Sequence, residues 1–478
     1  LFARRPGEGR AAAMAEQLRE NKMGVMPVGR LLVSMSLPIM LSMLVQALYN
    51  VVDSIFVAQL SEDALTAVSL AFPFQNLMIA VAVGTGVGVN ALLSRSLGEK
   101  KFDVANKAAG NGVLLSLLSS LVFIVLGVLL ARPFFEAQRA TAEIVEMGVE
   151  YLTIVGGLSL GLFVSIMFER LLQSTGKTIF TMITQGLGAI INIIFDPLLI
   201  FGIGPFPAMG VAGAAVATVL GQFMGGALTV FFHFCFNREI RLTWAAIRPD
   251  GGIIARIYAV GVPSIVMNAI GTVMTFAMNR ILMALTSTAA AVFGIYFKVQ
   301  SFAFMPIFGL NNGMVPIVAY NYGARKRKRL EATVRLSMIL AVAIMLVGLV
   351  VLQTAAEPIL KLFKASQSML DIGVPALRTI SLSFVFAGFC VISSSVFQAL
   401  GRGVQSMVVS IVRQLVVLIP VAYLLSLSGN VAAVWYAVPI AECFSLILCV
   451  VFLIRTHRQI IAPLGEEETS GQASPAQP

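Results

Sequence analysis

Two aspartates, Asp53 and Asp196, each lie inside a long apolar stretch of this chain. An ionisable side chain inside such a stretch is energetically costly, so each is a candidate for function. Ser42, Gln46, Asn50 and Asp53 follow one another at steps of four, four and three residues. A helix places residues at this spacing on one face. The resulting polar stripe predicts that this face points into the protein.

Asp196 follows Asn192 by one helical turn and directly precedes Pro197. If helices run through both segments, both carboxyl groups lie about 10 Å below the same surface, because a helix rises ~1.5 Å per residue. Two buried acids at equal depth can take up a proton, since burial and mutual repulsion favour the neutral form of one. Alternatively, oxygens of Asn50, Asn192 and Thr218 complete a sodium site with the carboxylates, since hard cations prefer oxygen ligands.

A structural reading of the same acids stays open. In that reading Asp196 caps backbone that is broken near Pro197, and Asp53 pairs with a local neighbour. Replacing either aspartate by asparagine separates the two readings, because only the functional reading predicts loss of ion-dependent activity.

The composition places these acids in a membrane protein. Of the 478 residues, 58% are hydrophobic and 12% are charged, whereas soluble domains are ~45–50% apolar and ~25% charged. In lipid, backbone polar groups must pair internally, which leaves helices or closed barrels. The apolar runs here are long and unalternated, which predicts helices rather than barrel strands.

We predict an all-α membrane protein with twelve transmembrane helices. Their boundaries follow the apolar runs, and glycine and proline occur within them, as is common in such helices. The predicted spans are approximately 32–59, 64–93, 107–131, 146–171, 179–202, 210–235, 256–284, 289–318, 332–354, 373–399, 407–427 and 431–454.

Lysine and arginine are concentrated in one set of connections, which includes the run RKRKR at 325–329. The opposite connections hold only Arg132, Arg139, Lys361 and Lys364. The positive-inside rule therefore predicts that both termini of this multi-pass protein are cytoplasmic, in a bacterial inner membrane. The basic run between two spans favours a topology anchor over a nucleic-acid site, so we expect lipid and no nucleic acid as partners.

The ends and connections of the chain complete the predicted organisation. Residues 1–22 lack an apolar core followed by a cleavage site, so we predict no signal peptide, and Met14 or Met23 is a candidate start. We predict a polar N-terminal tail at 1–29, a first lobe at 30–237 and a linker at 238–255. A second lobe at 256–455 and a C-terminal tail at 456–478 follow.

An internal repeat relates the two predicted lobes. Residues 37–101 align without a gap to residues 262–326, at an offset of 225. The offset pairs Gly84 with Gly309 and Gly88 with Gly313, and later pairs QSTGK at 173–177 with QALGR at 398–402. Beyond that, GVAGAAVAT at 210–218 resembles NVAAVWYAV at 430–438 at an offset of 220.

A duplicated unit of six helices crosses the membrane in the same sense twice. The two pseudo-symmetric bundles must then face each other across a central cavity, around an axis along the membrane normal. Paired bundles of this kind are typical of alternating-access transporters, and a channel or scaffold is the alternative.

Several motifs are misleading. STGKT at 174–178 ends like a phosphate-binding loop, but the required glycine is replaced by Leu171 and no strand precedes it. The glycines of GTGVGVN at 84–90 lie in a predicted helix, where they allow close packing or a bend. The two histidines and four cysteines show no metal-ligand spacing. With no catalytic constellation, we predict neither an enzyme nor a bound cofactor.

The second lobe lacks counterparts of the two aspartates, because the offset places Met278 opposite Asp53 and Val421 opposite Asp196. Ion coupling is therefore predicted in the first lobe. Lys298 and Glu442 fall near mid-depth in the second lobe, where they either pair with each other or contact a substrate.

Polar and flexible side chains near mid-depth are candidates for the wall of the central cavity. Methionine suits varied ligands, although in membrane helices it often only packs. Glu169 and Arg170 end the fourth span and favour a gate or an interfacial pair. The predicted cavity residues are Gln46, Gln75, Met274, Met278, Lys298, Gln300 and Glu442.

Four segments together resemble the MATE (multidrug and toxic compound extrusion) family, in a bacterial, MepA-like branch. They are LVQALYNVVDSIFVAQL at 44–60, GVGVNALLSRSLGEKK at 86–101, NIIFDPLLIFG at 192–202 and MVPIVAYNYGARK at 314–326. The resemblance implies two six-helix lobes and export of amphipathic, often cationic, small molecules.

The resemblance also implies that inward flow of protons or sodium drives this export. It places the cation site at Asp53, Asp196 and Asn192, with Thr218 as a weaker assignment. We thus expect a monomeric drug:cation antiporter that uses H⁺ or Na⁺. A flippase for lipid-linked oligosaccharides or related envelope precursors is the alternative, and it would favour a more cationic groove.

Overall fold

The computed structural model describes residues 20–138, 140–363 and 365–465, so the candidate start Met14 and the ends of both tails lie outside it. Within these residues the regular structure is entirely helical. Ten helices are long and apolar enough to cross a membrane, and two bent helix pairs bring the number of spans to twelve. The predicted all-α class with twelve spans is confirmed.

The first half of the chain forms the N-lobe. After the short helix α2 (Lys22–Val25), its helices are α3 (Val28–Leu60), α4 (Glu62–Gly98), α5 (Phe102–Leu129), α6 (Ala131–Glu136), α7 (Ala142–Gly157), α8 (Leu160–Ser174), α9 (Thr178–Phe201) and α10 (Val211–Phe236). The predicted linker contains α11 (Trp244–Ile247) and ends in the first turn of α12.

The second half forms the C-lobe. Its helices are α12 (Gly251–Leu285), α13 (Ser287–Gly323), α14 (Arg327–Leu362), α15 (Gln367–Ser381), α16 (Phe384–Ala399), α17 (Gly403–Ile411), the π-helix η1 (Val412–Leu418), α18 (Ile419–Ser426), α19 (Val431–Val434) and α20 (Ala437–Thr456), followed by η2 (His457–Ile461) and η3 (Ala462–Gly465).

One broken span occurs in each lobe, at equivalent places. The pair α7–α8 is bent by 44° and the pair α15–α16 by 48°. Ala142 and Gln367, where the two pairs begin, are separated by the repeat offset of 225. The duplication therefore preserves an irregularity of the backbone as well as the number of helices.

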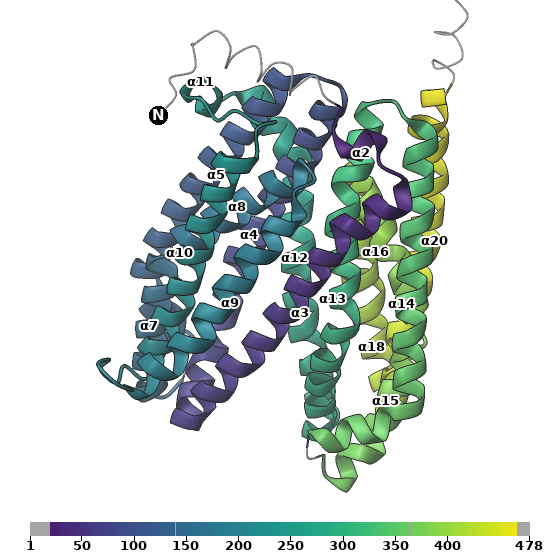
Figure 1. The fold of residues 1–478 in the computed structure, drawn as a ribbon. Helices are drawn as coiled ribbons and strands as arrows, with labels where there is room; N and C mark the ends of the chain where they lie inside the picture. The colour runs from purple at the N-terminus through teal and green to yellow at the C-terminus, as the bar shows by residue number, and fades with distance from the viewer. Residues whose placement is uncertain (1–19, 139, 364, 466–478) are drawn as a thin grey trace, which may run out of the picture.

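The two lobes stand side by side (Figure 1). We call the end that carries α2, α11 and the last turn of α20 the basic end, because the RKRKR run lies there between α13 and α14. From this end the lobes diverge toward the opposite end (Figure 1).

Glycines hold the two lobes together near the basic end. A Cβ atom on Gly98 of α4 would lie 2.0 Å from the backbone oxygen of Tyr320, and one on Gly323 of α13 would lie 2.1 Å from that of Arg95. Arg95 and Tyr320 are also separated by 225 residues. The two contacts are thus copies of one another across the axis that relates the lobes.

Glycines also make inter-lobe contacts about three turns further into the membrane. Gly88 of α4 packs directly on the backbone of Ile257 in α12, and Gly313 of α13 packs on Ser36 in α3. Any side chain at these glycines would force the helices apart, so the predicted role of the glycines in close packing is confirmed.

Residues 20–27, which we call the N-terminal strap, bridge the lobes at the basic end, where α2 lies (Figure 1). On the N-lobe, the Asn21 amide donates to the Thr175 backbone oxygen at 3.1 Å. On the C-lobe, Asn321 Nδ2 donates to the Met23 oxygen at 3.0 Å and Arg329 Nη2 to the Met26 oxygen at 2.6 Å. The basic run thus anchors the start of the chain.

Candidate functional site

The long helix α3 packs against α13 of the C-lobe and against α9 of its own lobe. The contact with α9 brings Asp53 and Asp196 close to each other. Asp196 is fully buried, and Asp53 Oδ1 is buried with no partner among the described residues.

Asn192 connects the acid pair to its surroundings. Its amide nitrogen donates to Asp196 Oδ2 at 3.0 Å, and its amide oxygen accepts from the Thr218 backbone N–H at 3.2 Å. Asn192 and Thr218 also line the central cavity described below. The structure thus brings together four of the five predicted cation residues. Asn50 is exposed and does not line the cavity.

Two tyrosines near the acids are not among the residues predicted from the sequence. Tyr49 and Tyr151 lie close to Asp53, and the Tyr151 hydroxyl accepts a hydrogen bond from Gln75 Nε2 at 3.1 Å. Tyr49 precedes Asp53 by one turn of α3, and this spacing in the sequence could have placed Tyr49 on the same helix face as Asp53. Tyr151 comes from α7, and its approach depends on tertiary packing.

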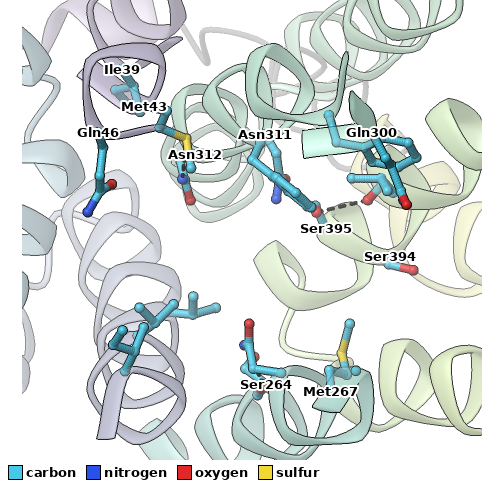
Figure 2. A pocket seen from close by; sticks show the side chains of 18 of the residues that line it. Ile39, Met43, Gln46, Ser264, Met267, Gln300, Asn311, Asn312, Ser394 and Ser395 are labelled. Atoms are coloured by element: carbon cyan, nitrogen blue, oxygen red, sulfur yellow. Dashed lines mark hydrogen bonds between the residues drawn. The ribbon is translucent and has the colours of Figure 1, made fainter. Parts of the chain in front are cut away.

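A cavity of about 770 Å³ lies between the lobes. This volume is in the range that holds drug-sized molecules. Figure 2 shows Met43 and Gln46 on one side, with Gln300, Ser394 and Ser395 across the cavity from them. The wall contains both polar and apolar side chains, which suits an amphipathic molecule.

Most of the predicted cavity residues line this space: Gln46, Met274, Met278, Gln300 and Glu442. Gln75 and Lys298 do not. Gln75 instead bonds Tyr151 in the N-lobe.

The predicted pairing of Lys298 with Glu442 is wrong. Lys298 is exposed, and Glu442 Oε1 accepts from Arg413 Nη1 at 3.3 Å. Tyr296, which lies near Glu442, is two residues before Lys298 on α13. Two residues turn a helix by about 200°, so Lys298 points away from the cavity.

Arg413 is not among the predicted residues, although a basic residue inside an apolar span is itself a signal of function. It lies in η1, where the span between α17 and α18 becomes a π-helix, and it lines the cavity beside Gln414. The register of a π-helix cannot be read from hydrophobic spacing, so neither its direction nor its partner follows from the sequence.

Glu169 and Arg170 on α8 are buried and line the cavity. Arg170 Nη1 donates to Asn312 Oδ1 on α13 at 2.9 Å, which joins the two lobes. The Glu169 carboxylate accepts from Gln185 Nε2 at 2.8 Å. The predicted interfacial position holds for Arg170, whereas the hydrogen bonds of Glu169 stay within the N-lobe.

Among the described residues, no group of three or more histidine, cysteine, aspartate or glutamate side chains is placed to hold a metal ion. A sodium ion at the acid pair would therefore rely on amide and hydroxyl oxygens in addition to the two carboxylates. Asn192 and Thr218 lie next to the acids, and the Asn192 amide would have to rotate to turn its oxygen toward such an ion.

Comparison with known proteins agrees with this architecture. The MatE family model matches residues 38–198 and again residues 263–424. The two matches begin 225 residues apart, so the family unit coincides with the internal repeat.

Relatives match over most of their length. A FAD transporter of Shewanella oneidensis is 26% identical over 435 residues, which cover 88% of this chain and 94% of that protein. The multidrug export protein MepA of Staphylococcus haemolyticus is 26% identical over 426 residues, with 88% and 93% covered. An outward-facing structure of a multidrug resistance MATE family transporter matches with a TM-score of 0.85 and 25% identity, covering 94% of this chain and 98% of that one.

Proposed function

Because this chain belongs to the MATE family of transporters, we propose that it is a secondary active multidrug exporter. It exchanges amphipathic or cationic small molecules for protons or sodium ions that flow inward. One observation carries the proposal: Asn192 both bonds the buried carboxyl pair and forms part of the cavity wall.

This connection supports a mechanism that couples the binding of the ion to the binding of the drug. A cation bound at Asp53 and Asp196 neutralises charge next to Asn192 and changes the hydrogen bonding of its amide, and so alters the adjacent wall of the cavity. Exchange requires that the two ligands prefer different states of the protein. Ion entry therefore lowers the affinity for the outgoing molecule, and drug binding lowers the affinity for the ion by the same factor.

In this proposal the structure represents the outward-facing state of the cycle. The inter-lobe glycine contacts, the Arg170–Asn312 bond and the N-terminal strap all lie toward the basic end. The concentration of lysine and arginine at that end supports a cytoplasmic location of both termini. We place the protein in the bacterial inner membrane as a monomer.

The test is ethidium transport into everted vesicles that contain the wild-type protein, which is the direction that corresponds to efflux from the cell, with the pH gradient and the sodium gradient collapsed separately. Loss of efflux with one gradient identifies the coupling ion and supports antiport. Efflux that survives the collapse of both gradients contradicts it. Vesicles that contain an Asp53→Asn variant at equal abundance give the background.

A second candidate is translocation of an anionic molecule, such as a lipid-linked oligosaccharide precursor. It is supported by Arg170 and Arg413, which both line the cavity and offer donors to an anion, while Glu169 and Glu442 line the same cavity and balance their charge. Rescue of an envelope-precursor defect, without any change in dye tolerance, would favour this function over drug export.

A further inference from the structure

The C-lobe wall of the cavity contains a charged pair that the repeat does not copy. Arg413 and Glu442 both line the cavity. The repeat offsets place Gly188 and Gln222 at the equivalent positions of the N-lobe. The pair is thus an addition to one lobe, and it lies apart from the carboxyl pair of the N-lobe.

Glu442 is incompletely paired. Its side chain is deeply buried, with the residue 8% exposed. Oε1 makes one contact of 3.3 Å with Arg413 instead of the two-bond fork that arginine and carboxylate often form. Oε2 is buried and has no hydrogen-bond partner among the described residues. A buried carboxylate oxygen without a donor is energetically costly. A ligand that donates a hydrogen bond to Oε2 would remove this cost.

The backbone around Arg413 is also unusual. Val412–Leu418 forms a π-helix of seven residues within a membrane span. π-Helices are rare and frequently mark functional sites. Arg413 and Gln414 of this π-helix both line the cavity.

An aromatic surface adjoins the carboxylate. Tyr296 lies near Glu442, and Phe293 stacks on Tyr296 with ring centroids 6.1 Å apart and an angle of 20° between the planes. Both rings line the same cavity. Such a surface accommodates the apolar body of a ligand whose charged end reaches the carboxylate.

We propose that Glu442, Arg413 and Tyr296 form a subsite for the protonated amine of the exported molecule. This inference rests on the proposed export function and names its substrate class: amphipathic amines that keep at least one N–H donor when charged. The ammonium donates to the unpaired oxygen of Glu442, which can turn to the cavity because the terminal torsion of glutamate is broad. A quaternary ammonium has the same charge but no N–H, so it does not supply the missing bond.

The test uses two fluorescent dansyl amides in proteoliposomes. One ends in a dimethylamino group that is protonated at pH 7, and the other ends in the corresponding trimethylammonium. In Glu442→Gln, the half-saturating concentration for the dimethylammonium dye should rise roughly tenfold, because a hydrogen bond to a charged acceptor is lost. The value for the trimethylammonium dye should rise clearly less, because this dye loses the charge attraction but no hydrogen bond. Equal changes for both dyes, or no change for either, would overturn the subsite.

Two further variants complete the design. Glu357→Gln removes a surface carboxylate that is bonded to Lys361, and it should leave transport of both dyes unchanged. If Glu442→Gln does not fold, Glu442→Asp retracts the charge and should lower the preference for the dimethylammonium dye. A wild-type protein that transports neither dye contradicts the proposed export function, whereas an active wild type with unselective Glu442 variants contradicts the subsite alone.

Discussion

The two lobes of this transporter share their packing but differ in their charges. Gly98 and Gly323 make equivalent contacts with the backbone of the opposite lobe. In contrast, the carboxylate of Asp53 is replaced by Met278, which is buried at the equivalent place in the C-lobe. After the duplication, these two glycines of the inter-lobe contact have stayed the same, whereas the position of the acid has diverged.

This difference has a physical origin. A glycine that touches a neighbouring backbone admits no side chain, so both copies of the contact are restricted in the same way. An acid in a membrane helix is energetically costly, so it is retained only where it serves a function. One ion site per molecule is sufficient for coupling. The C-lobe is therefore free to replace the acids and to carry the Arg413–Glu442 pair instead.

The largest expected effect is on drug efflux, and it distinguishes Asp53 from Met278, its equivalent in the C-lobe. Asp53→Asn should reduce drug efflux to the level of empty vesicles, because an amide does not take up and release a proton. Met278→Leu should retain at least about half of the activity, since it conserves volume. Dye efflux at matched protein abundance in the membrane measures both. Wild-type efflux by Asp53→Asn would end the assignment of coupling to the N-lobe.

The next largest effect is on stability, and it concerns the glycine contacts that the two lobes share. Gly98→Ala and Gly323→Ala should each lower the stability by about 1–3 kcal/mol, because the new Cβ clashes with backbone oxygen. The two losses of stability should be of similar size, and thermal unfolding in detergent measures both. Gly294→Ala is the control, since no atom lies within 4 Å of the added Cβ. A large effect at only one of the two glycines would contradict the symmetry of the interface.

A smaller effect is expected where the lobes meet through unlike side chains. Arg170→Gln should reduce efflux by roughly three- to tenfold, because its charge-assisted bond to Asn312 helps to close the basic end. Asn312→Ala should give a similar loss, and the double variant should show less than the summed effect. Arg132→Gln, which affects only exposed ion pairs with Glu136 and Glu146, is the control. Strictly additive losses would show that the two side chains act independently.

The smallest effect is expected at the strap. Arg329→Gln removes bonds to the backbone oxygens of Met23 and Met26 and should lower stability by about 1–2 kcal/mol. Efflux should stay within about threefold of wild type. Lys328→Gln, an exposed neighbour in the same basic run, should change neither quantity. Equal effects of the two variants would mean that the charge of the run matters and that the contact with the strap does not.

The sequence predicted the twelve spans, the duplication and the approach of Asp53 to Asp196, because hydrophobic runs, glycine spacing and helix depth depend on local geometry. It did not predict the partner of Glu442. Finding Arg413 requires the direction of a side chain on a π-helix, which hydrophobic spacing does not encode. Tyr151 was missed for a related reason, since its position next to the acids depends on how α7 packs in the folded lobe.

The N-terminal strap also has a consequence for how the protein is made. Asn321 bonds the Met23 backbone across a separation of 298 residues. At ~5–20 residues per second, a ribosome needs roughly 15–60 s to synthesise the chain between these two points. During that time the strap can form bonds only with the N-lobe, so its docking on the C-lobe follows the insertion of α13 into the bilayer. The strap is thus synthesised before both lobes and is among the last parts to reach its final position.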